Sequence, residues 1–157
     1  MSGIIGTILL VLLIGITVFN IYATATKKKR DGSAKVRYDA LFSAIENEIL
    51  KSDSSWNTAK VKRIVTEDEQ GILAALDDEK RRAVIGWQGG TFPFSYDDYI
   101  GSELNDEKGL ILTVRTKNDA LDLTLSEGKF RKNGSACKPV KDMGRIMKEF
   151  LDTIQTK

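Results

Sequence analysis

The first 26 residues contain no charged side chain, and four basic residues follow them directly. Between Gly3 and Ala23 almost every residue is apolar, and a helix needs about 20 such residues to cross the hydrocarbon core of a bilayer. Backbone amides inside hydrocarbon must find their hydrogen-bond partners within the segment, which favours a helix. The sequence therefore predicts that residues 1–26 form a transmembrane anchor.

The residues that flank the apolar segment predict its orientation. A basic run lies on its C-terminal side, within a polar hinge of residues 27–33, and consists of Lys27, Lys28, Lys29 and Arg30. Positively charged flanks stay in the cytoplasm, and each basic residue near an anionic lipid surface contributes about 1 kcal/mol of attraction. We therefore expect a single-pass protein of the inner cell membrane, with the N-terminus outside, a cytoplasmic C-terminal domain and a basic run that contacts membrane lipid.

A cleaved secretory signal is the alternative to an anchor. The tripeptide Ala23-Thr24-Ala25 fits the small-residue pattern of a cleavage site. No Lys or Arg precedes the apolar run, however, and the run is longer than the roughly 7–15 apolar residues of a signal peptide. An uncleaved anchor is therefore favoured, while a signal peptide or a reversed anchor would place the same domain outside the cytoplasm.

The residue composition limits the chemistry of the rest of the chain. Without the basic run, 20 of the 24 Lys and Arg residues remain against 22 Asp and Glu, which does not indicate a nucleic-acid-binding surface. The chain has no histidine and a single cysteine, so an intramolecular disulfide, a Ser-His-Asp triad, a Cys-His pair and a histidine-containing metal site are excluded. We expect no cofactor, no metal and no catalytic residues.

Apolar residues at helical spacing predict two amphipathic helices. The first helix lies within residues 34–55, and its stripe consists of Tyr38, Leu41, Phe42, Ile45 and Ile49. The second runs to the end of the chain, and its stripe consists of Val140, Met143, Ile146, Met147, Phe150, Leu151 and Ile154. The second stripe fits either the core of the domain or a helix face that binds a partner.

The part of the chain between these helices has the pattern of six or seven short strands. Leu121, Leu123 and Leu125 alternate with polar residues, which is typical of a half-buried antiparallel strand, whereas residues 61–66 have a weaker strand pattern. The connections are short, so the strands are expected to pair in an antiparallel meander. Residues 56–157 are therefore predicted to form one α+β domain, a curved sheet or barrel of the pleckstrin-homology-like (PH-like) layout, capped by a C-terminal helix.

Three motifs give this prediction a family resemblance. An acidic strand end and turn at 77–79 precedes a basic, apolar strand; an aromatic strand and an acidic hairpin follow, and their matching residues are Phe94, Tyr96, Asp98, Ile100, Glu103, Leu104 and 106–109. Over residues 64–155 the chain resembles small bacterial membrane-anchored proteins with a PH-like domain. It departs from their pattern by one additional residue between Asp98 and Ile100.

The resemblance implies an adaptor or scaffold that holds a protein partner or an anionic lipid headgroup at the membrane. In PH domains that bind phosphoinositides, basic residues near an early hairpin contact the phosphates, and the corresponding residues here are Lys80, Arg81 and Arg82. The same residues also fit a solvated turn, and the acidic residues at 77–79 would oppose an anionic ligand. Both interpretations are open at this point.

A carboxylate-based enzyme is the alternative from another functional class. Its acid–base pair would come from Asp77, Asp97, Asp98, Glu103 and Asp106. The spacing of these residues does not match a calcium-binding EF-hand loop, and carboxylates of this kind are commonly found in turns and on surfaces. An enzyme would require a concave pocket that gathers at least two of them.

Overall fold

The computed structural model describes residue 27 and residues 32–107, 109–127 and 137–157. The chain divides into two compact units, residues 1–40 and residues 41–157. In the first unit, residues 32–40 are helical. The predicted anchor, residues 1–26, lies outside the described part of the chain, as do Lys28, Lys29 and Arg30 of the basic run. Within the part that is described, no helix combines the length and the apolar character needed to cross a membrane.

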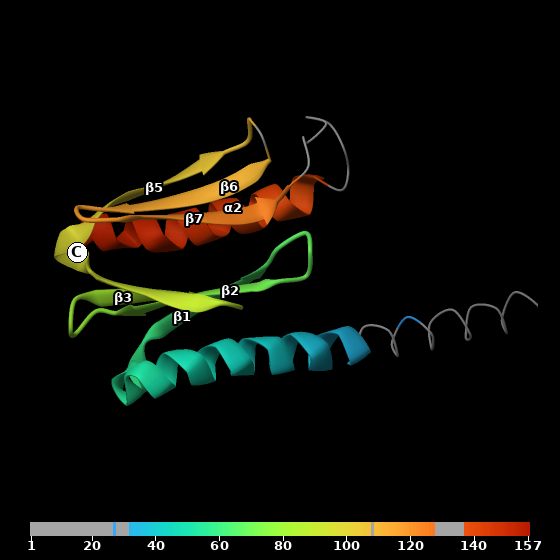
Figure 1. The fold of residues 1–157 in the computed structure, drawn as a ribbon, viewed down its shortest axis with the longest axis horizontal. Helices are drawn as coiled ribbons and strands as arrows, with labels where there is room; N and C mark the ends of the chain where they lie inside the picture. The colour runs from blue at the N-terminus through green and yellow to red at the C-terminus, as the bar shows by residue number, and fades with distance from the viewer. Residues whose placement is uncertain (1–26, 28–31, 108, 128–136) are drawn as a thin grey trace, which may run out of the picture. The chain divides into compact units, whose positions relative to one another are not determined.

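The second unit contains seven strands in two antiparallel sheets (Figure 1). Residues 41–52 are helical and lead into the short 3₁₀ helix η1 (Ser54–Thr58). The first sheet has the order β1 (Lys60–Val65), β2 (Gly71–Asp77), β3 (Arg82–Trp87), β4 (Gly90–Ser95). The second sheet follows the 3₁₀ helix η2 (Tyr96–Asp98) and has the order β5 (Tyr99–Asn105), β6 (Leu110–Thr116), β7 (Ala120–Ser126).

The C-terminal helix joins the two sheets. Helix α2 (Cys137–Asp152) continues into the 3₁₀ helix η3 (Thr153–Thr156). It packs mainly against β5 of one sheet and β1 of the other, and Figure 1 shows it between the sheets. Met147, Leu151 and Ile154 of this segment are buried in the main core, together with apolar residues from both sheets. The predicted α+β class, with antiparallel strands and a C-terminal helix, is confirmed.

Strand β2 is buried on both faces, which explains its nearly continuous apolar sequence. Its residues Ile72, Ala74 and Leu76 belong to the core between the sheets. The alternate residues Leu73 and Ala75 lie on the opposite face, where the buried side chains of Phe42, Ile45, Ile49 and Trp56 form a second apolar layer. The part of the predicted amphipathic stripe that belongs to this unit, from Leu41 onward, therefore covers the outer face of the four-stranded sheet.

Glycine in β3 allows this helical segment to approach the sheet closely. A Cβ atom at Gly86 would lie 2.8 Å from Cγ2 of Ile45 and 2.9 Å from Cδ1 of Ile49. A glycine inside a strand commonly marks such a close approach. The absence of a side chain at this position thus fixes how deeply residues 45–49 sit against the sheet.

Strand β5 contains an irregularity near its start. The pairing of β5 with β6 shifts between Tyr99 and Gly101. A bulge of this kind accommodates one extra residue in one strand of an antiparallel pair. Ile100 is the residue left out of the pairing, and the register is regular from Gly101 to Asn105.

Candidate functional site

Arg82 is the centre of an internal ion-pair cluster. Its Nε donates to Oδ2 of Asp77 at 3.1 Å, its Nη1 donates to Oδ2 of Asp53 at 2.5 Å, and its Nη2 donates to the hydroxyl of Ser55. The guanidinium also lies 4.2 Å from the ring centre of Trp56. Arg82 therefore ties β3 to the end of β2 and to the segment that follows the helical residues 41–52.

This cluster stabilises the ionised carboxylate of Asp53. Hydrogen bonds from the hydroxyl and backbone N–H of Ser55, followed by the bond from Arg82, hold the pKa of Asp53 well below its usual range. Asp53 also caps η1, because its side chain accepts the hydrogen bond from the N–H of Ser55. The carboxylate is thus used to order the turn between helix and sheet.

Asp78 is a second point where charges converge. Its carboxylate accepts hydrogen bonds from Nζ of Lys60 at 2.7 Å, from the Tyr96 hydroxyl at 2.8 Å and from Nζ of Lys157. Lys157, then Lys60 and Tyr96, hold the pKa of Asp78 well below its usual range. These contacts join the β2–β3 turn to β1 and to the C-terminal segment.

Acidification is expected to weaken the domain partly through Asp78. A carboxyl group whose pKa is lower in the folded state stabilises the protein above its unfolded-state pKa of about 3.9, and this contribution is lost as the pH falls through the folded-state value. We therefore expect the free energy of unfolding, measured with urea, to fall from about pH 5 downward and to fall less steeply in the variant Asp78→Asn. Asp68→Asn, which removes an exposed carboxylate, is the control and should keep the wild-type slope.

Asp152 connects α2 to β5 in a similar way. The hydroxyls of Tyr99 and Ser102 each donate to its Oδ1 at 2.8 Å, and Lys148 pairs with its Oδ2. Burial raises the pKa of Asp152, but the hydrogen bonds from Lys148, Tyr99 and Ser102 outweigh it, so the net pKa is lowered. Burial raises the pKa of Tyr99 above its ordinary value. This cluster fixes the position of the helix on the sheet.

The structure places the three predicted headgroup residues at the β2–β3 turn. The backbone N–H of Lys80 donates to Asp77 at 3.2 Å. The guanidinium of Arg81 donates to Asp97 at 3.2 Å and to the carbonyl oxygen of Lys157 at 3.0 Å, and Arg82 lies in the cluster described above. Both arginines therefore already pair with carboxylates of the same domain.

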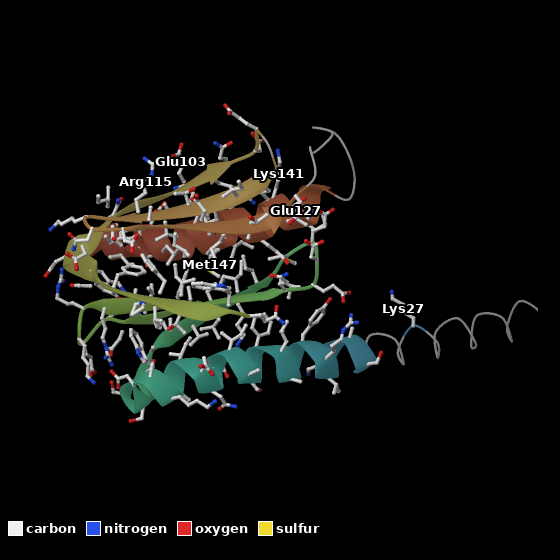
Figure 2. The ribbon with its side chains drawn as sticks, viewed as in Figure 1. Lys27, Glu103, Arg115, Glu127, Lys141 and Met147 are labelled. Atoms are coloured by element: carbon white, nitrogen blue, oxygen red, sulfur yellow. The ribbon has the colours of Figure 1, made fainter. Side chains whose placement is uncertain are left out.

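Four of the five acidic residues considered for an enzyme lie in separate ion pairs. The pairs are Asp77 with Arg82, Asp97 with Arg81, Glu103 with Arg115, and Asp106 with Lys141. Figure 2 shows Glu103 and Arg115 on the outer side of the second sheet, away from Lys141. In the described ranges, no group of three or more His, Cys, Asp or Glu residues is arranged to hold a metal ion. This distribution fits surface and structural charges.

A hollow beside β1 combines an apolar lining with an open mouth. This β1 cleft has a volume of about 280 Å³ and is lined by Glu46, Ile49, Leu50, Trp56, Ala59, Val61, Leu73 and Ala75. Val61 and Leu50 are 44% and 37% exposed. The carboxylate of Glu46, the only charged group of the lining, pairs with Arg63.

Strand β1 forms an edge of its sheet next to this cleft. In the described part of the chain it pairs with β2 alone, with Val61 opposite Ala75 and Arg63 opposite Leu73. Helix α2 also packs against β1, and the N–H of Glu67, just beyond its end, donates to the carbonyl oxygen of Leu125 in β7 at 2.9 Å. The first half of β1, where Lys60, Val61 and Arg63 are exposed, is therefore the part of the other edge that a further strand could reach. Sequence reasoning missed this site because β1 has a weak pattern; the signal was a valine at 61 between two lysines, where alternation would place an apolar side chain on one face.

Comparisons with known proteins give no match: no protein family, no curated protein and no solved structure shows significant similarity to this chain.

Proposed function

We propose that this protein is a single-pass, membrane-anchored adaptor whose PH-like domain binds a protein partner on the cytoplasmic side of the inner membrane. The division of seven antiparallel strands into groups of four and three, followed by a helix that packs against both groups, supports the PH-like assignment. The charge-free segment 1–26 and the basic run behind it support the anchor and its orientation.

The single observation that carries the binding function is the β1 cleft beside an edge strand that, among the described strands, pairs on one side only. An added strand gains affinity from main-chain hydrogen bonds and specificity from pockets that receive its alternate side chains. The β1 edge offers the first and the cleft offers the second. Tethering to a membrane raises the local concentration of such a binder, so a modest intrinsic affinity is sufficient.

A protein partner is favoured over a lipid headgroup as the ligand of the folded domain. Arg81 and Arg82 have carboxylate partners in the domain, so a phosphate would have to compete with Asp97, Asp53 and Asp77. Lys27, Lys28, Lys29 and Arg30, by contrast, are proposed to contact anionic lipid. Membrane attachment and partner binding are thus assigned to different parts of the chain.

Two measurements in cells test the proposal. A topology reporter fused after Lys157 should be active only in the cytoplasm, and a reporter active outside would support the extracytoplasmic alternative. A photoreactive phenylalanine derivative in place of Val61 should form covalent adducts with another protein, whereas the same group in place of the exposed Lys117 should not. The absence of adducts from every exposed position tested would contradict an adaptor function.

A further inference from the structure

We propose that the partner docks as an extended segment along the free edge of β1 and that this segment alternates aliphatic with acidic side chains. This inference rests on the proposed adaptor function and adds the strand that binds and the chemistry of the ligand. It is argued from the two faces of β1, because a strand added to a sheet continues the alternation of its neighbour.

The face of β1 that carries Val61 selects the aliphatic side chains. Val61 lines the β1 cleft together with Leu73 and Ala75 of β2, while Leu50 lies at the mouth of the cleft. Side chains of an added strand on this face would extend the same surface and enter the cleft between the helical residues 46–50 and η1. An apolar, partly exposed hollow of this size accepts an aliphatic side chain and disfavours a charged one.

The opposite face of β1 selects the acidic side chains. Lys60 and Lys62 alternate with Val61 and Arg63, so they lie on the other side of the strand, opposite the core-facing residues Leu76 and Ala74 of β2. Lys62 forms no ion pair within the described residues, and Lys60 keeps a largely exposed side chain although it pairs with Asp78. Opposite charges on neighbouring strands attract, and like charges repel. A carboxylate beside Lys62 would therefore complement the strand.

The same charges exclude a second copy of the chain as the occupant. β1 contains three basic residues and no acidic residue. Two β1 strands paired edge to edge would bring the basic side chains of one copy close to those of the other. Lysines on an edge strand are a common barrier to such self-association. Two copies of this edge therefore repel each other, whereas a strand of opposite charge is attracted to it.

The test uses the full chain in nanodiscs and a displayed library of short random peptides as the probe. Selected peptides are expected to alternate aliphatic with Asp or Glu residues. On binding, they should slow amide hydrogen exchange in β1 and leave exchange in β5, an edge strand of the other sheet, unchanged. Failure to select any peptide, or protection of another strand instead of β1, would overturn the assignment.

A charge reversal gives the sharper test of the proposed ligand. Lys62→Glu should weaken binding of the selected peptides by about tenfold in fluorescence anisotropy and should turn a repeated selection toward Lys and Arg. Lys117→Glu makes the same change of charge at an exposed position after β6 and should leave the affinity unchanged. Equal effects of the two variants would show that only long-range charge is involved and would overturn the inference.

The two proposals fail in distinguishable ways. Peptides that protect another strand, together with photoreactive adducts at that strand in cells, would leave the adaptor function intact and remove β1 as its site. If no peptide is selected and no exposed position yields an adduct, the adaptor function fails as well.

Discussion

Replacing Arg82 with alanine is expected to lower the free energy of unfolding by about 3 kcal/mol, because the substitution leaves a buried carboxylate without its main partner. The side chain of Asp77 is only 5% exposed, and Arg82 is its salt-bridge partner. The same change removes the hydrogen bonds to Asp53 and Ser55 and the contact with the Trp56 ring. Urea unfolding of the full chain in mild detergent, followed by tryptophan fluorescence, measures the loss.

Arg115→Ala provides the matched control for this prediction. Arg115 pairs with Glu103, but both side chains are largely exposed, and ion pairs of this kind contribute about 1 kcal/mol or less. A similar loss in the two variants would contradict the structural role given to the Arg82 cluster. The substitution Asp77→Asn together with Arg82→Ala should recover part of the stability, since no buried charge is then left unpaired.

Replacing Met147 with alanine is expected to cost about 3 kcal/mol as well, through the loss of a fully buried side chain. Met147 has no exposed surface and lies in the core with residues of both sheets, and Figure 2 shows it in the interior of the domain. The surrounding side chains come from separate elements and cannot all collapse into the space. The change should appear as a lower midpoint of urea unfolding with little change in its denaturant dependence.

Met143→Ala is the control on the same helix. Met143 is 36% exposed, so its truncation should cost about 1 kcal/mol or less. If both variants lose the same stability, the division of this helix into a buried and an exposed side is incorrect. The structure thereby resolves the two interpretations of the stripe: Met147 belongs to the core, whereas Met143 and Ile146 leave apolar surface exposed on α2.

The sequence predicts the elements of this domain well where one face of an element is buried. The alternation of Leu121, Leu123 and Leu125 identifies β7, and the helical spacing that ends at Ile154 identifies the C-terminal helix. These patterns are readable in the sequence because the residues that face the core recur at the fixed period of a strand or a helix. The same logic fails for β1, whose outer face meets a helix and an open cleft.

The charge clusters could not be predicted in the same way. Asp53, Asp77 and Arg82 come from different elements. Their contact depends on how the end of the helical segment sits beside the end of β2 and the start of β3. From the sequence alone, Arg82 could equally face a phosphate in solvent. One unused signal was available: Gly71 begins one apolar strand and Gly86 lies inside another, which indicates that another element approaches the sheet closely at these positions.

The two-sided burial of β2 has a practical consequence for anyone who dissects the protein. A fragment that starts after residue 52 would retain the seven strands. It would, however, lack the apolar helical residues that cover Leu73, Ala75 and Val84. Because this apolar surface would be exposed, such a fragment should aggregate during purification even though its sheets are complete. The shortest fragment expected to stay in solution therefore begins upstream of Leu41, because it keeps the helical segment that covers this surface together with the strands.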